Sequence, residues 1–233
     1  MPHSKNKSLI VIAIDGTSAS GKSTNSKLVA KALNFVHVDT GAMYRTLAWY
    51  CLKQQVDVQD AKAVAAVCRR WKTALKCGDG NAYLMVDGYY PTTEIRTAEV
   101  SAAVPHVAAV SKVRGWMKKT QRECLKFGSL VMEGRDIGTN VFPETDFKYY
   151  LDAKLEERSR RRAADGIQEN LAARDQRDSQ RAVAPLMIAL GAKVINNSLM
   201  TAEQTSGTIL ADIKMRMADR DKPAVKRQKA EAK

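Results

Sequence analysis

LIVIAIDGTSASGKST, residues 9–24, is the stretch that decides the fold. An apolar run, Leu9–Ile14, leads into the pattern G-x-x-x-x-G-K-[ST], which begins at Gly16 and is followed by apolar residues at helical spacing. Strand, glycine-containing loop and helix thus follow in the order that phosphate binding requires, because loop amides and the positive end of a helix both attract an anion. The stretch predicts a nucleoside triphosphate site.

The residues of this loop have distinct expected roles in binding ATP and Mg²⁺, the two expected cofactors. Gly16 and Gly21 allow backbone conformations that other residues resist. Lys22 is expected to reach the β- and γ-phosphates, and the Ser23 hydroxyl is expected to be the Mg²⁺ ligand. The predicted ATP-binding residues are Gly16, Thr17, Ser18, Ala19, Ser20, Gly21, Lys22, Ser23 and Thr24.

Length and composition restrict the class of protein. The 233 residues are enough for one α/β domain with a large core. No apolar run of about 18 residues predicts a membrane span, and we expect residues 1–8 to be a loose tail, not a signal peptide. The four cysteines lack metal-type spacing, which favours reduced thiols in the cytoplasm. We expect a monomer without a membrane partner.

The net charge of +13 has two explanations. Basic residues can line a site for several phosphates, or a basic surface can bind nucleic acid. Arg220–Lys233 holds six basic and two acidic residues, or +4 of the excess, and we interpret residues 219–233 as a solubilising basic tail. We find no basic platform interleaved with aromatic residues, so nucleic-acid binding is not expected.

Strands and helices alternate along the chain, which predicts an α/β fold with a parallel sheet and helices on both faces. One segment differs: Trp71–Lys76 and Ala82–Val86 flank a glycine-rich turn and predict an antiparallel hairpin. Pro105 is expected to stop or kink a helix near Val104. The other predicted strands are Leu9–Ile14, Phe35–Val38, Leu130–Met132, Phe147–Leu151 and Lys193–Asn196.

Three further motifs follow the phosphate loop: DTGAMYR at 39–45, EGRDIGT at 133–139 and RDQRDSQRAVAPL at 174–186. In this order and spacing they resemble bacterial cytidylate (CMP) kinases over about residues 9–218. The resemblance implies a P-loop NTPase-type parallel sheet with helices on both faces. It also implies a single kinase domain at 9–218, with a small antiparallel β insertion at 71–95 beside the monophosphate site and a short lid at about 156–173.

The resemblance implies transfer of the γ-phosphoryl group of ATP to CMP or dCMP, giving CDP or dCDP. Arginine suits this chemistry, because its fork grips phosphate oxygens and neutralises the charge of the moving group. The implied catalytic residues are Lys22, Arg135, Arg158, Arg162 and Arg181. The implied CMP-binding residues are Thr40, Arg45, Ser101, Arg114, Arg135, Asp136, Arg174, Asp178 and Arg181.

Two positions depart from the family pattern and leave alternatives open. Pro105 stands where familiar members have a serine that contacts the nucleoside, and our hypothesis is that Ser101 or a water replaces that contact. Glu133 stands where the family usually has aspartate, and its longer side chain can shift an Mg²⁺–water contact. A kinase for UMP or AMP is therefore one alternative, and a basic RNA-binding NTPase is an alternative from another class.

Overall fold

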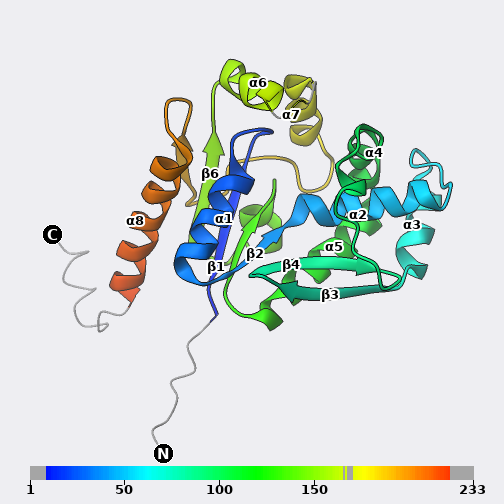
Figure 1. The fold of residues 1–233 in the computed structure, drawn as a ribbon, viewed down its shortest axis with the longest axis horizontal. Helices are drawn as coiled ribbons and strands as arrows, with labels where there is room; N and C mark the ends of the chain where they lie inside the picture. Colours follow the sequence, from blue (N-terminus) through cyan, green and yellow to red (C-terminus); the bar gives the residue numbers. More distant parts are fainter. Residues whose placement is uncertain (1–8, 165, 167–169, 221–233) are drawn as a thin grey trace, which may run out of the picture.

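A central sheet organises the computed structural model, which describes residues 9–164, 166 and 170–220 (Figure 1). Within these residues the strand order is β3-β4-β2-β5-β1-β6-β7, and every pair except the antiparallel β3–β4 is parallel. The predicted tails at 1–8 and beyond Arg220 lie outside the described residues. The strands are β1 (Val11–Gly16), β2 (Val36–Asp39), β3 (Thr73–Gly78), β4 (Asn81–Val86), β5 (Leu130–Glu133), β6 (Phe147–Asp152) and β7 (Lys193–Asn196).

Helices cover both faces of this sheet, as predicted, because its central strands are apolar on both sides. Ile12 and Ile14 of β1 pack in one core with α1 and α8, whereas Val11 and Ala13 pack in a second core with α2, α3, α4 and α5. The helices are α1 (Lys22–Leu33), α2 (Thr40–Lys53), α3 (Ala61–Arg70), α4 (Ala98–Ala109), α5 (Ser111–Glu123), α6 (Leu155–Ala164), α7 (Leu171–Ser179) and α8 (Ala202–Arg220).

The direction in which the chain crosses the sheet reverses around β1, which determines where a ligand can bind. After β1 the chain crosses to β2 on one side of the sheet, and after β5 it crosses to β6 on the other side of β1. Open α/β sheets bind ligands at the carboxyl ends of their strands where the crossover direction changes. That point is the carboxyl end of β1, and α6 and α7 lie over this end of the sheet (Figure 1).

The predicted hairpin is confirmed, and it is part of the main sheet. Asp79 and Gly80 form its turn with φ of +49° and +71°, the left-handed pair that two-residue hairpins favour. β4 then pairs in parallel with β2, through His37 with Asn81 and Val38 with Ala82. The hairpin therefore extends the sheet from its β2 side and brings Asn81 next to β2.

The helix does not stop near Val104, which was one of the two outcomes expected at Pro105. α4 continues through Pro105 to Ala109, and the chain leaves helical geometry at Val110, where ψ is +114°. Proline removes one backbone hydrogen bond, but Val100, Ala103 and Val107 bury the apolar side of α4 on both sides of it. Packing thus maintains a helix that the local sequence opposes. None of the helices among the described residues combines the length and apolarity needed to cross a membrane.

Gly16 provides the sharp exit from β1 and generates the first prediction. Its φ is +149°, and a Cβ added there would lie 2.0 Å from the carbonyl oxygen of Leu151 in β6. We expect Gly16→Ala to lower the free energy of unfolding by about 3 kcal/mol or more, because both the backbone strain and the contact oppose it. The melting temperature should fall by roughly 6–12 °C in calorimetry.

Gly115→Ala is the control for this prediction. Nothing lies within 4 Å of a Cβ at Gly115, which sits in the middle of α5. This variant should keep the wild-type stability or gain about 0.5–1 kcal/mol. A Gly16→Ala protein that melts with the wild type would contradict the close approach of β1 to β6.

Candidate active site

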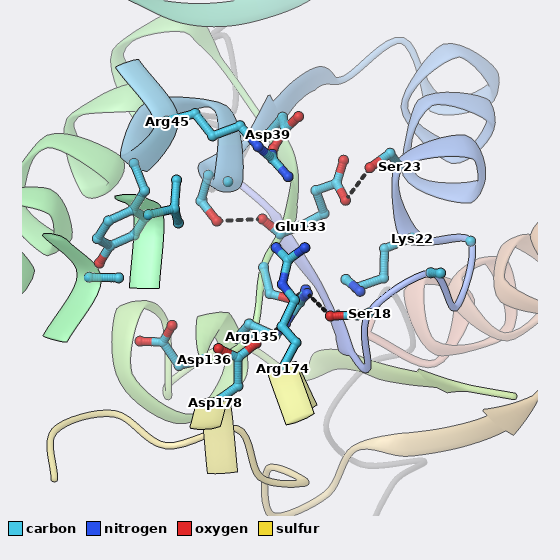
Figure 2. A pocket seen from close by; sticks show the side chains of 18 of the residues that line it. Ser18, Lys22, Ser23, Asp39, Arg45, Glu133, Arg135, Asp136, Arg174 and Asp178 are labelled. Carbon is cyan, nitrogen blue, oxygen red and sulfur yellow. Dashed lines mark hydrogen bonds and ion pairs between the residues drawn. The ribbon is translucent and has the colours of Figure 1, made fainter. Parts of the chain in front are cut away.

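A cleft of about 500 Å³ lies at the carboxyl ends of β1, β2 and β5 (Figure 2). Residues from several parts of the chain line it: the phosphate loop, the end of β2 and the start of α2, the segment from Arg96 through α4 to Arg114 of α5, the turn after β5, and the segment around α6 and α7. The predicted site residues that line the cleft are Ser18, Ala19, Gly21, Lys22, Ser23, Thr24, Thr40, Arg45, Arg114, Arg135, Asp136, Arg162, Arg174, Asp178 and Arg181.

The phosphate loop has the curvature of an anion-binding turn. Ala19 and Gly21 have φ of +57° and +85°, so neighbouring backbone amides alternate in direction as they do in anion-binding nests. The Lys22 ammonium folds back and donates to the carbonyl of Thr17. Burial lowers the pKa of Lys22 well below its usual value, and the charge of Arg135 lowers it further. A bound polyphosphate would stabilise the charged lysine.

Four predicted site residues are not among those that line the cleft: Gly16, Thr17 and Ser20 of the loop itself, and Arg158 of α6. Their contacts support the loop instead. Thr17 Oγ1 donates to Asp152 Oδ1 over 3.1 Å. Buried Arg158 donates to the carbonyl of Ser18 over 3.1 Å and pairs with Asp175, whose Oδ1 accepts from the Ser18 amide. Arg158 therefore links α6, α7 and the loop from behind.

Ser23 and Glu133 bring two oxygen ligands together at the mouth of the loop. The Ser23 hydroxyl donates to Glu133 Oε2 over 2.8 Å, which Figure 2 shows as a dashed line. Glu133 is the last residue of β5 and is 4% exposed. Mg²⁺ prefers oxygen ligands and needs only one or two from the protein beside phosphates and water. The donor set therefore fits Mg²⁺.

Arginines from separate elements meet on the other side of the cleft. Figure 2 shows Arg45, Arg135 and Arg174 reaching toward the space between Glu133 and Lys22. Asp178 holds two of the basic residues: Arg135 Nε donates to its Oδ2 over 2.9 Å, and Arg181 donates to its Oδ1. Such fixed forks suit bidentate contacts to a phosphate.

The pKa values of Arg45 and Asp178 are shifted by burial and by the neighbouring charges in the cleft. Burial lowers the pKa of Arg45 to about 10, although the charge of Asp39 raises it. Burial alone would raise the pKa of Asp178, but the charges of Arg135 and Arg181 lower it below its usual value. The positive groups therefore gain from any anion that enters the cleft.

A buried ion pair closes the far end of the cleft. Arg114 Nη2 lies 2.8 Å from Asp136 Oδ2, and the guanidinium lies 5.7 Å from the centre of the Tyr44 ring. Asn140 also donates to the Asp136 carboxylate over 2.9 Å. The pair presents a donor and an acceptor close together, which suits the polar edge of a base.

Comparison with known proteins agrees with this geometry. A family model described as cytidylate kinase matches residues 12–215. The chain belongs to the cytidylate kinase family. It is 39% identical over 219 residues to a cytidylate kinase of Geobacillus sp. strain WCH70, covering 89% of this chain and 98% of that protein.

Other members of the cytidylate kinase family are similarly related. The chain is 40% identical over 215 residues to the cytidylate kinase of Limosilactobacillus reuteri strain DSM 20016, covering 87% of this chain and 94% of that protein. It is 41% identical over 227 residues to a bifunctional pantoate ligase/cytidylate kinase of Acaryochloris marina. That match covers 91% of this chain and 43% of the bifunctional protein.

Ser101 is the predicted substrate residue that the structure does not bring to the cleft wall. It lies half-buried in α4, whereas Val104 and Ala108 of the same helix line the cleft. Sequence reasoning also omitted several lining residues. Asp39 belongs to the DTGAMYR motif and caps α2 by accepting from the Ala42 amide over 2.9 Å. An aspartate just before a predicted helix is a sequence signal that could have identified it. Arg96, which pairs with Asp39 over 3.3 Å, carries no motif that would reveal it.

The carboxylate of Asp178 generates a prediction for stability. Because the pKa of Asp178 is lowered in the folded protein, its stabilising effect is present above the unfolded pKa of about 4 and is lost as the pH falls through the folded value. Asp178→Asn should therefore lower the free energy of unfolding by about 2–3 kcal/mol at pH 7. The deficit should shrink toward pH 3 in urea titrations.

Glu123→Gln is the matched control, because Glu123 is exposed at the end of α5. Its stability should follow the wild type at each pH. An Asp178→Asn deficit that is the same at pH 3 as at pH 7 would show that the ionised carboxylate is not its source.

Proposed function

We propose that this protein is a cytidylate kinase, which transfers the γ-phosphoryl group of ATP to CMP or dCMP and gives CDP or dCDP. The observation that carries the proposal is the family match over residues 12–215. The cleft supports it, because a phosphate loop and a separate set of arginines face one another across a space large enough for two phosphate groups.

In this proposal the loop amides and Lys22 hold the β- and γ-phosphates of ATP, while Ser23 and Glu133 face the Mg²⁺ that accompanies ATP. Mg²⁺, when bound, supplies positive charge to the phosphate oxygens. The 2.8 Å contact between the Ser23 hydroxyl and Glu133 supports this placement. The polyphosphate would end beside Arg135, whose Nη2 already contacts Ser18 over 2.9 Å.

The acceptor phosphate is proposed to lie among Arg45, Arg135 and Arg181. It is ionised near neutral pH, so its oxygen can attack the γ-phosphorus without a strong general base. The residues act by alignment and by charge neutralisation, with Arg162 and Arg174 near the transferred group. Residues 156–173, part of which lies outside the described residues, are proposed to be the lid that excludes water.

The pair Arg114–Asp136 is proposed to select the base. A carboxylate accepts a hydrogen bond from an exocyclic amino group, which cytosine has and uracil lacks, and a guanidinium donates to the neighbouring ring acceptors. At the corresponding place UMP would bring a carbonyl oxygen toward Asp136. AMP also carries an amino group, but it is a larger purine. This pair therefore favours CMP over UMP, while shape must discriminate against AMP.

We also propose that the enzyme acts as a monomer on small nucleotides in the cytoplasm. Cys51, Cys68, Cys77 and Cys124 are free thiols, which supports a reducing compartment. The arginines of the cleft account for part of the positive charge without nucleic acid. RNA-stimulated ATP hydrolysis with salt-sensitive RNA binding would favour an RNA-binding NTPase instead.

A coupled assay of ADP release tests the proposed function. We expect CMP and dCMP to be phosphorylated much faster than UMP or AMP. Lys22→Met should lower kcat by roughly 10²-fold or more, because a charge contact to the transferred group is lost. Lys27→Met, at an exposed position of the same helix, should leave kcat unchanged.

Acceptor selectivity has its own variant. Asp136→Asn should raise the KM for CMP by roughly 10–100-fold and leave the KM for ATP near the wild-type value. A wild-type enzyme that prefers UMP or AMP would show that the base assignment is wrong. An Asp136→Asn enzyme with an unchanged KM for CMP would remove Asp136 from base recognition.

A further inference from the structure

Glu133 has a long, flexible side chain, but its carboxylate must point toward Ser23 if it is to face a metal ion in the cleft. It is buried, and its two carboxylate oxygens face different partners. Oε2 accepts from the Ser23 hydroxyl over 2.8 Å on the cleft side. Oε1 faces the protein interior, where His37 Nε2 lies at 3.3 Å and Ser26 Oγ at 3.4 Å. The interior contacts therefore determine which way the cleft-side oxygen points.

His37 is itself held from behind by the hairpin. Its Nδ1 lies 3.1 Å from Asn81 Oδ1, at the position where β2 and β4 are in register. The Asn81 amide nitrogen donates to the Asp79 carbonyl over 2.8 Å, so the amide oxygen is the atom turned toward His37. An amide oxygen only accepts, so the contact to Asn81 requires a hydrogen on Nδ1. A carboxylate oxygen also only accepts, so the contact to Glu133 requires a hydrogen on Nε2 as well, and His37 acts here as a donor at both nitrogens.

Ser26 completes the support on the α1 side. Its Oγ lies 3.0 Å from His37 Nε2 and also within reach of Glu133 Oε1. His37 is 4% exposed, and Ser26 is fully buried. His37, Ser26 and Asn81 are not among the described residues that line the cleft. They contact a site residue without contacting the space that a nucleotide would fill.

We infer that His37, oriented by Asn81, is a positioning residue that holds Glu133 toward Ser23 and the Mg²⁺ of the proposed ATP site. This inference rests on the proposed function for the metal but not for the acceptor. A glutamate side chain has one more rotatable bond than an aspartate side chain. Glu133 therefore loses more conformational entropy when its carboxylate is held against Ser23. Groups that orient a metal-facing carboxylate commonly change metal affinity by 10–100-fold when removed.

Two substitutions at His37 distinguish the contribution of Nδ1 from that of Nε2. In His37→Asn, the side-chain amide lies near the position of Nδ1, and the new side chain is too short to donate to Glu133. In His37→Gln, the longer amide can place a donor near the position of Nε2. The first should therefore lose the contact to Glu133, and the second should restore much of it.

The readout is the affinity for ATP across an Mg²⁺ titration, measured by calorimetry without an acceptor nucleotide. We expect His37→Asn to need about ten-fold more Mg²⁺ for half-maximal tightening of ATP binding, and His37→Gln to stay within about three-fold of the wild type. ATP affinity without Mg²⁺ should be equal in all three proteins. Equal Mg²⁺ requirements in His37→Asn and the wild type would overturn the inference.

His106→Asn is the matched control, because it makes the same change at an exposed histidine of α4. It should leave the Mg²⁺ requirement unchanged. A wild-type protein that binds ATP with Mg²⁺ but phosphorylates no CMP would refute the proposed function and leave this inference standing. Loss of ATP affinity without Mg²⁺ in His37→Asn would assign His37 a purely structural role and refute the inference.

Asn81→Ala provides a second test that leaves His37 in place, should His37→Asn fail to fold. Removing the acceptor at Nδ1 frees the ring to turn, so the Mg²⁺ requirement should rise in the same direction by a smaller factor, about three-fold. A wild-type Mg²⁺ requirement in Asn81→Ala would show that the hairpin does not orient His37 toward the metal side.

Discussion

The parallel pairing of β1 with both β5 and β6 determines where the charged groups of the cleft lie. Ile14 is in register with Glu133 on one side, and Gly16 is in register with Leu151 on the other. The phosphate loop and the turn after β5 therefore leave the sheet side by side. Asp15 ties them together by accepting from the amides of Ile137 and Gly138 over 2.9 and 2.8 Å.

Concentrated positive charge is the main electrostatic constraint on this arrangement. Lys22, Arg45 and Arg135 belong to three different elements, and burial lowers the pKa of the first two. Like charges in one small cleft repel each other, and carboxylates such as Asp39 and Asp178 offset only part of this. An incoming phosphate relieves the remaining repulsion, so the same charges that oppose folding favour binding.

The local elements of the fold could be predicted from the sequence. The loop after β1, α1 and the hairpin turn depend on glycines and apolar spacing within short segments, and the structure has each of them where it was expected. The family motifs also identified most of the lining residues, since each motif follows a strand whose carboxyl end lies at the cleft.

The remaining features depend on contacts between distant residues. Pro105 stays inside a helix because of packing that no local pattern reveals. Arg158 supports the loop from behind because Asp175 and Ser18 come together only in the fold. His37 looks like an ordinary strand residue until pairing of β2 with β4 places Asn81 beside it. Such roles are determined by sheet order and burial, which the linear sequence does not display.

The central claim is that two nucleotides bind end to end in one cleft. Calorimetry with a bisubstrate analogue, in which adenosine and cytidine are joined by a chain of phosphates, tests it most directly. We expect one analogue to bind per chain, about 10²-fold tighter or more than ATP or CMP alone, and to be displaced by either nucleotide. Binding no tighter than that of ATP, or displacement by ATP but not by CMP, would contradict it.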